Sequence, residues 1–183
     1  QLATIRPGVL SRRQPREQSD AAVHVLDAPR SARLRTISKT QAGEDAGELQ
    51  RAEIVVAVGQ GMGPEGYGAL DELRAALGGA ALGSTRKVTD KGWLPRGTQI
   101  GVTGHSIAPR LLVAVASSGR FNHTVGIRNA QVILAINSDP DAEIFDQVDV
   151  GLVGGWEDMV PALTAELVSR ELFPGDVAVP AAP

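Results

Sequence analysis

The feature that most constrains the fold is a series of short apolar runs after residue 52, which end in or run into glycine, serine, threonine or asparagine. Nearly continuous apolar strands are typical of a parallel sheet covered on both faces, because neither face meets water. Amphipathic or glycine-rich segments separate the runs and favour crossover helices. The sequence therefore predicts an α/β fold with a doubly wound, mainly parallel six-stranded sheet, whose ligands gather at the carboxyl ends of the strands.

The expected strands are residues 53–59, 80–84, 98–104, 111–116, 131–137 and 149–154. The expected helices are residues 66–78, 85–92, 121–129 and 156–173. Helical periodicity is absent from residues 1–50, where two short apolar pieces at 21–26 and 33–37 favour peripheral strands. We therefore divide the chain into an irregular, β-rich N-terminal extension, a main domain at 51–175 and a tail at 176–183.

The composition excludes several classes of protein. The chain has 183 residues, 43% of them hydrophobic, so it can bury a sizeable core. A formal net charge of −3 gives no broad attraction for nucleic acid, and no apolar run is long enough to insert into a membrane. With no cysteine there is no disulfide or thiolate metal site. The first residues lack the apolar core of a secretion signal, so we expect a cytoplasmic location.

A GxGxxG pattern at residues 61–66 follows the first apolar run and precedes a helical-looking segment. Such glycines let a backbone approach a pyrophosphate at a helix N-terminus. The acidic residue expected about 20 residues further on is replaced by Thr85 and Arg86. The pattern therefore leaves two interpretations open: an NADP site, or a strand-to-helix turn with Pro64 near the helix start.

A more specific signal comes from several blocks in one order. They are AEIVVAVGQGM (52–62), GSTRKVTDKGWLP (83–95), TQIGVTGHSIAPRLLVAVASSGRFNH (98–123) and VILAINSDPDAEIFDQVDVGLVGGWEDMVPAL (132–163). Residues 53 to about 167 resemble the C-terminal FAD-binding domain of the electron transfer flavoprotein α subunit, as a divergent member. Residues 1–50 resemble the end of that subunit's N-terminal domain, so we expect a fragment of a longer subunit.

The resemblance implies a Rossmann-like domain that binds FAD and pairs with the electron transfer flavoprotein β subunit. Such a heterodimer carries electrons from flavin dehydrogenases, such as acyl-CoA dehydrogenases, toward a membrane quinone reductase and the respiratory quinone pool. The implied cofactor-binding residues are Gln60, Thr85, Arg86, Gln99, Gly101, Val102, Thr103, Ser118, Gly119, Arg120, Phe121, Asn122, His123, Asn137, Gly155 and Trp156.

At the flavin end, the resemblance implies that Arg86 lies against the isoalloxazine ring and that the Thr103 hydroxyl bonds flavin N5. His123 would lie near the flavin C2 carbonyl. A fixed cation near the ring raises its reduction potential, because reduction adds negative charge there. One charge about 4 Å away, at an effective dielectric constant near 20, is worth about 4 kcal/mol, or roughly 170 mV for one electron. Arg86 is thus the expected determinant of the potential.

At the other end, the resemblance places Thr85, Ser118 and Asn122 near the phosphates and Asn137 beside the adenosine half. This chain departs from the family pattern at Gln60, where the family has an arginine that contacts the cofactor. The guanidinium of an arginine is well suited to bind a pyrophosphate, so the glutamine at this position means that a positive charge near the site is lost.

Other departures follow. Val102 is found where the family has a glutamine, and His105 is found where the family has a lysine. Arg120 and Phe121 lie beside the proposed phosphate site, where Arg120 could supply the missing charge. Gly155 replaces an aspartate that would hold a ribose, and the indole of Trp156 could stack on the adenine instead.

Three functions remain open at this point: an electron carrier without substrate chemistry of its own, an NADP-dependent oxidoreductase domain, and an interaction subunit that binds no cofactor. Arg86 could instead pair with Asp90 one helical turn away. Trp93 and Trp156 could equally be packing residues. The sequence shows no convincing metal-ligand set and no hydrolase triad in its usual context.

Overall fold

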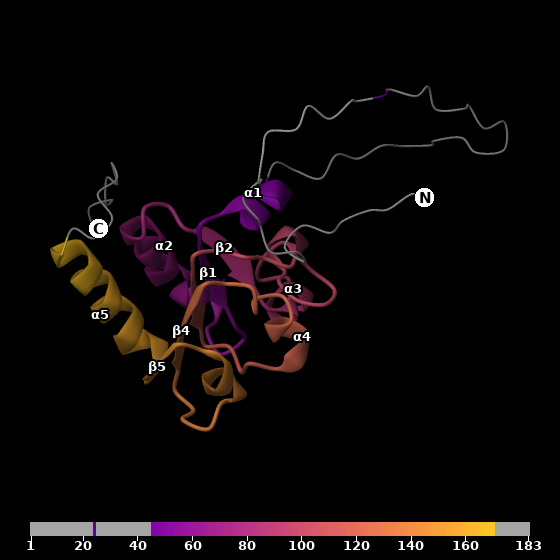
Figure 1. Cartoon of the computed structure of the whole chain (residues 1–183). Helices are drawn as coiled ribbons and strands as arrows, with labels where there is room; N and C mark the ends of the chain where they lie inside the picture. Colours follow the sequence, from indigo (N-terminus) through magenta and orange to yellow (C-terminus); the bar gives the residue numbers. More distant parts are fainter. Residues whose placement is uncertain (1–23, 25–44, 171–183) are drawn as a thin grey trace.

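The computed structural model describes residue 24 and residues 45–170. Apart from His24, the two N-terminal strands that we expected lie outside these residues, as does the tail. The strands are β1 (Ile54–Val58), β2 (Ala81–Ser84), β3 (Leu111–Val115), β4 (Val132–Asn137) and β5 (Val150–Val153). They form a parallel sheet in the order β2-β1-β3-β4-β5, so the predicted α/β doubly wound fold is confirmed (Figure 1).

The α-helices are α1 (Asp45–Arg51), α2 (Tyr67–Ala76), α3 (Arg86–Asp90), α4 (Phe121–Thr124) and α5 (Trp156–Ser169). Three 3-10 turns are η1 (Pro64–Gly66), η2 (Arg96–Thr98) and η3 (Glu143–Gln147). The expectation of no helix before residue 51 was wrong for α1. A helix of two turns is too short to display periodicity, and its stability comes from packing, here through the buried Leu49. No helix in residues 45–170 is long and apolar enough to cross a membrane.

The prediction of a sixth strand at residues 98–104 was wrong, since the sheet of the described residues has five strands. Gln99 makes one isolated bridge with Ser84, and Ile100 makes one with His105. Gly101 has φ +135°, and a Cβ there would lie 2.2 Å from the carbonyl oxygen of Asn122. The chain therefore turns back at this glycine, and the amide of Gly101 donates to the carbonyl of His105 (3.0 Å).

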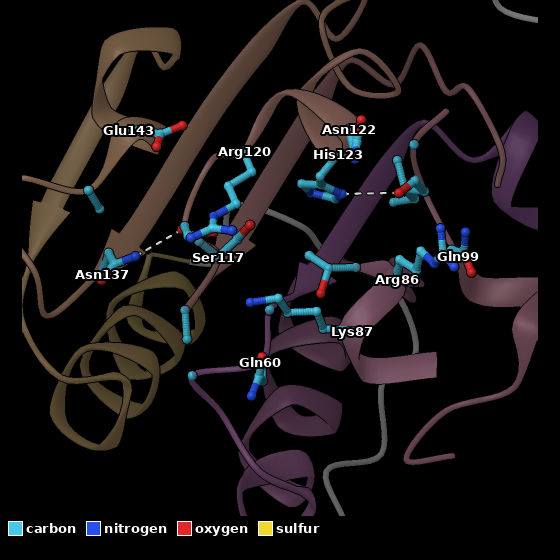
Figure 2. Close-up of a pocket in the computed structure, with 18 of the residues that line it drawn as sticks. Gln60, Arg86, Lys87, Gln99, Ser117, Arg120, Asn122, His123, Asn137 and Glu143 are labelled. Atoms are coloured by element: carbon cyan, nitrogen blue, oxygen red, sulfur yellow. Dashed lines mark hydrogen bonds between the residues drawn. The ribbon is translucent and has the colours of Figure 1, made fainter. Parts of the chain in front are cut away.

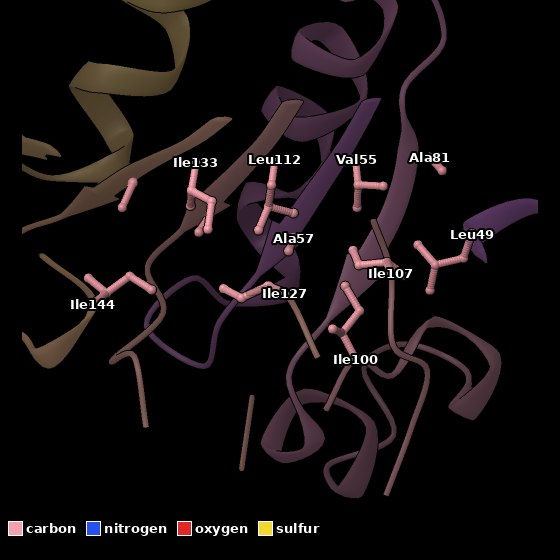
Figure 3. Close-up of a cluster of buried hydrophobic side chains, with 12 residues drawn as sticks. Leu49, Val55, Ala57, Ala81, Ile100, Ile107, Leu112, Ile127, Ile133 and Ile144 are labelled. Atoms are coloured by element: carbon pink, nitrogen blue, oxygen red, sulfur yellow. The ribbon is translucent and has the colours of Figure 1, made fainter. Parts of the chain in front are cut away.

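The two faces of the sheet are covered differently. On the helix-covered face, α2 and α5 pack together over side chains such as Val56, Leu73 and Val160 (Figure 1). The loop-covered face is buried by α1, the 98–107 loop, the segment after α4, and η3. Its buried side chains, shown in Figure 3, include Leu49, Val55, Ile100, Ile107, Leu112, Ile127, Ile133 and Ile144.

The loops that follow β1 and β3 are held together at the carboxyl end of the sheet. The amide of Gly59 donates to the Val115 carbonyl (2.8 Å), and that of Gly61 donates to the Ala116 carbonyl (3.2 Å). A Cβ at Gly59 would lie 2.1 Å from the Ala116 oxygen, so glycine is required for this approach. The chain runs from β1 outward to β2 and then returns to β3 on the other side. The junction of β1 and β3 is therefore the switch point at which doubly wound sheets bind ligands.

Candidate cofactor site

A pocket of about 790 Å³ opens at the carboxyl ends of the strands, above the junction of β1 and β3 (Figure 2). The loops after β1, β2, β3 and β4 all contribute to it, together with the 98–104 loop. Its volume lies in the range of sites that hold a large organic ligand. The pocket therefore occupies the position in which the sheet topology predicts a cofactor.

Most of the predicted site residues line this pocket. They are Gln60, Thr85, Arg86, Gln99, Gly101, Val102, Thr103, Ser118, Arg120, Asn122, His123 and Asn137. Segments that are up to 77 residues apart, from Gln60 to Asn137, thus meet in one cavity. The predicted residues that are not part of the lining are Gly119, Phe121, Gly155 and Trp156.

Two of these four residues have structural roles. Gly119 has φ +79°, and a Cβ there would lie 2.1 Å from the backbone nitrogen of Ile144, so it lets the loop after β3 pack on η3. Trp156 packs in the helix-covered core, and a Cβ at Gly66 would lie 2.7 Å from its indole. Of the two interpretations of Trp156, packing is the one that the contacts favour.

The GxGxxG pattern does not wrap the pocket. Gly61 lines it together with the preceding Gly59 and Gln60, whereas Gly63 and Gly66 do not. Gly66 instead makes room for the side chains of Met62 and Trp156. Of the two interpretations of this pattern, the contacts favour the strand-to-helix turn.

A chain of hydrogen bonds orients the hydroxyl of Thr103. The Thr89 hydroxyl lies 2.9 Å from both Gln99 Oε1 and the Arg86 carbonyl oxygen, and donates toward them. Gln99 Nε2 donates to Thr103 Oγ1 at 2.8 Å. Because Thr103 Oγ1 accepts this bond, its own proton is available to an acceptor in the pocket. Gln99 therefore positions Thr103 besides lining the cavity.

His123 is buried, with 7% of its surface exposed. Its Nδ1 lies 3.2 Å from the Ile100 carbonyl, so Nδ1 carries the proton and donates (Figure 2). Burial lowers the pKa of the imidazole. The hydrogen bond to Ile100 raises it, but burial has the larger effect. Nε2 is buried and has no partner in the described part of the chain. A neutral ring in the wall of the pocket thus keeps a buried acceptor without a partner, which is unusual for a buried polar atom.

Arg86 makes the contact that the simpler interpretation foresaw. Its Nε lies 3.1 Å from Asp90 Oδ2, and Arg96 approaches the other oxygen of Asp90 at 3.4 Å. The Arg86 side chain is 61% exposed and also lines the pocket. Part of the charge of Arg86 is thus neutralised by the Asp90 carboxylate at the rim of the pocket.

Asn137 ties two loops together instead of presenting a free amide. Its Nδ2 donates to the Ser117 carbonyl (2.8 Å), and its Oδ1 accepts from the Asp139 amide (3.0 Å). Near this tie, Ala116 has φ 52°, a left-handed conformation that is strained for a residue with a Cβ. The wall of the pocket is therefore held by backbone contacts at both β3 and β4.

Sequence reasoning missed several lining residues: Lys87, Asp90, Ile100, Ala116, Ser117, Asp139, Asp141, Ala142 and Glu143. Position alone could have found many of them, because most come within a few residues of a strand's carboxyl end. Residues 45–170 contain no group of three side chains suited to a metal ion.

Taken together, the parallel sheet, the pocket at its switch point and the polar lining define an α/β cofactor-binding domain. The family model of the electron transfer flavoprotein FAD-binding domain matches residues 48–128. The matched residues belong to this family of domains, whose cofactor is FAD. In the family, α subunits form heterodimers with a β subunit.

Individual relatives agree with this assignment. The chain is 35% identical to the electron transfer flavoprotein subunit α of Thermoanaerobacterium thermosaccharolyticum, over 91% of this chain and 52% of the relative. It is 37% identical to protein FixB of Bradyrhizobium diazoefficiens, over 94% of this chain and 48% of the relative. It is 31% identical to the acryloyl-CoA reductase electron transfer subunit β of Anaerotignum propionicum, over 88% and 46%. The chain thus spans about half the length of these relatives.

The residues present fit FAD. The cavity is long enough to draw its lining from β2 to β4, and the cations Arg86, Lys87 and Arg120 can face phosphate. The Thr103 hydroxyl has a proton to donate, and His123 Nε2 is an acceptor without a partner in residues 45–170. A few polar groups of this kind are what orients a bound ring system.

Proposed function

We propose that this chain is the FAD-binding part of an electron transfer flavoprotein α subunit and that it carries electrons between flavoenzymes. The observation that supports this most is the convergence of the family's block residues on one pocket at the switch point. The same observation supports a carrier without a substrate of its own, because most of the predicted cofactor residues line this one cavity.

Different parts of the pocket would hold different parts of the cofactor. At the β2 side, Thr103 would donate its proton to the ring, with Gln99 holding its hydroxyl in place. His123 Nε2 suits a ligand N–H, and a ligand carbonyl at that position would require the imidazole to take up a proton. FAD supplies the one-electron redox chemistry when bound.

The phosphates and the adenosine would extend from there toward β4. Thr85, Ser118 and Asn122 line the cavity where the phosphates are expected, and Asn137 braces the adenosine side. Gly155 and Trp156 stay predictions for the adenosine, although neither is part of the lining.

Arg86 would raise the reduction potential of the ring, and Asp90 would weaken that effect by pairing with it. Arg86→Gln should lower the first reduction potential. The shift in potential should be smaller than the roughly 170 mV expected for a charge about 4 Å away at a dielectric constant near 20, because the Arg86 side chain is 61% exposed and water screens its charge. Potentiometric titration measures the shift, and an unchanged potential would remove Arg86 from this role.

The proposed function is tested by the visible spectrum of the purified chain before and after addition of FAD. A bound flavin, or saturable uptake of FAD, is the expected result. A colourless chain that does not take up FAD would overturn the proposal. Saturable binding of NADPH without FAD would instead favour an NADP-dependent oxidoreductase, and binding of neither would favour an interaction subunit.

The partners are proposed from the family and from the relatives' names. We propose a β subunit as the permanent partner, flavin dehydrogenases as donors and a membrane quinone reductase as the acceptor. Val102 and Phe121, 46% and 72% exposed, are apolar side chains beside the pocket whose segments are joined by the bond from the Val102 amide to the Asn122 carbonyl. Their exposure supports a partner that covers this side. Co-purification with the β subunit tests the pairing.

The domain boundaries and the location also stay proposals. We propose that residues 1–50 are the end of an N-terminal domain, that residues 51–175 are the FAD-binding domain and that the tail follows. Leu49 packs in the core of the FAD-binding domain, so α1 contacts that domain across the proposed boundary at residue 50. A cytoplasmic location remains a prediction of the sequence.

A further inference from the structure

Lys87 is a pocket residue that the family resemblance did not single out. It is the second residue of α3 and lies directly after Arg86, which follows β2. Its side chain lines the cavity and points into it from the α3 wall, toward the loop after β3 that carries Arg120 (Figure 2). Two cations, one from α3 and one from the loop after β3, thus line the same cavity.

These two cations differ from their neighbours in having no counter-charge. Within residues 45–170, neither the ammonium of Lys87 nor the guanidinium of Arg120 makes a salt bridge or a side-chain hydrogen bond. Arg86, by contrast, is paired with Asp90, which is also shared with Arg96. The cations on the α3 side therefore divide into one that the protein neutralises and one that it leaves available.

Like charges that point into one cavity repel each other, and an anion between them removes that cost. The other carboxylates of the lining, Asp139, Asp141 and Glu143, belong to the β4 side, and none of them is ion-paired with either cation. Gln60, which Figure 2 shows on the same side of the cavity as Lys87, adds an amide but no charge. Lys87 and Arg120 are therefore the lining cations that no carboxylate of residues 45–170 neutralises.

We propose that Lys87 and Arg120 form a two-sided clamp for the diphosphate of the cofactor, with Lys87 as the residue that makes the site selective for a phosphorylated flavin. This inference rests on the proposed function and assigns a role within the same site. A diphosphate carries charge that two cations can share. The lysine supplies a compact charge with three donors, and the arginine supplies a planar fork.

The test compares ligands with and without phosphate on matched variants. Lys87→Gln removes the charge, Lys87→Arg keeps it, and Lys91→Gln is the control, because Lys91 belongs to the same turn but stacks on Trp93 (4.1 Å) outside the lining. Flavin fluorescence gives the Kd for FAD and for riboflavin, and ADP and adenosine are tested as competitors. Thermal melting checks that the variants fold.

We expect Lys87→Gln to weaken FAD and ADP about tenfold, as for the loss of one charge-assisted hydrogen bond, and to leave riboflavin and adenosine unchanged. Lys87→Arg should restore most of the FAD affinity, and Lys91→Gln should behave as the parent chain. The affinity of the parent chain for FAD should also fall with salt more steeply than that of Lys87→Gln.

An unchanged FAD Kd in Lys87→Gln would overturn the clamp, as would an equal loss for FAD and riboflavin, which would indicate general damage to the site. If the parent chain binds no FAD at all, the proposed function fails and the clamp fails with it. If the parent chain binds FAD and Lys87→Gln binds it equally well, only the clamp fails.

Discussion

The helix-covered and the loop-covered faces of the sheet bury similar apolar side chains but relate differently to the pocket. On the helix-covered face, Leu73 and Val160 fill the core from α2 and α5 and do not reach the pocket. On the loop-covered face, Ile100 is both a core residue and part of the lining, and Ile144 follows the lining residue Glu143. Packing and ligand binding are therefore separable on one face and coupled on the other.

The largest effect is expected where a loop touches a loop. Gly119→Ala places a Cβ against the backbone of Ile144 in a left-handed conformation, so we expect a loss of about 4 kcal/mol or more in the free energy of unfolding. FAD affinity should fall as well, because a shift of η3 would also displace Glu143, which belongs to η3 and lines the pocket. Gly68→Ala, at an exposed position of α2, is the matched control. A Cβ at Gly68 would have no atom within 4 Å, so this change should raise the free energy of unfolding by about 0.5–1 kcal/mol. Denaturant titration measures both; a Gly119→Ala chain as stable as the parent would contradict the coupling.

The next effect separates the faces directly. Leu73→Ala and Ile100→Ala each remove a fully buried side chain, so each should cost about 2–5 kcal/mol in the free energy of unfolding. Only Ile100→Ala should also weaken FAD, measured where both variants are folded. The Ile100 side chain anchors the segment whose backbone carbonyl at residue 100 holds His123, so its loss should loosen that contact. Equal FAD affinity in the two variants would show that the faces do not differ in this respect.

A smaller effect should appear on acidification. Burial lowers the pKa of His123 in the folded chain, so below the ordinary histidine pKa of about 6.5 the unfolded chain binds a proton that the folded chain does not. Stability is therefore present above that pH and is lost as the pH falls toward the folded pKa, by up to about 1.4 kcal/mol per pH unit. Denaturant titrations between pH 7 and 5 should show this slope in the parent chain and a shallower one in His123→Gln. Parallel profiles would assign the slope to other groups.

The smallest effect is expected at the exposed rim. Asp90→Asn removes the ion pairs with Arg86 and Arg96, both of which have exposed side chains, so the cost should be about 0.2–1 kcal/mol and should shrink with added salt. Unfolding at low and high salt measures it. A loss of more than about 2 kcal/mol in the free energy of unfolding would contradict this expectation, because it would mean that the rim stabilises the fold as strongly as buried side chains do.

Much of the fold followed from the sequence because strands covered on both faces must be apolar along their length. Five of the six predicted strands lie where the apolar runs are, and α2, α3, α4 and α5 begin within one residue of their predicted positions. The 98–104 segment misled the prediction, because Ile100 and Val102 alternate with polar residues as in a strand, although Gly101 turns the chain. The helix α1 was missed because seven residues are too few to reveal a period.

The site was predictable only in part. Block residues such as Thr103 and His123 were identified because the family pattern marks them, and they line the pocket. The pattern gave no indication of Lys87 or Glu143, which reach the cavity only because the segments after β2 and β4 lie at the same end of the sheet.

By itself, then, the sequence determined the parallel strands, the carboxyl-end location of the site and the family, since these depend on local apolarity and on blocks of residues in one order. The tertiary structure alone decided the strand order, the packing role of Trp156 and which cations of the pocket stay unpaired. Asp90 neutralises Arg86 while Lys87, one residue further along, faces the cavity without a counter-charge in residues 45–170. The Arg86–Asp90 pair is local to one helical turn, so the sequence could propose it. That Lys87 and Arg120 line one cavity without a carboxylate partner depends on distances that exist only once the loops from separate strands have met at the end of the sheet.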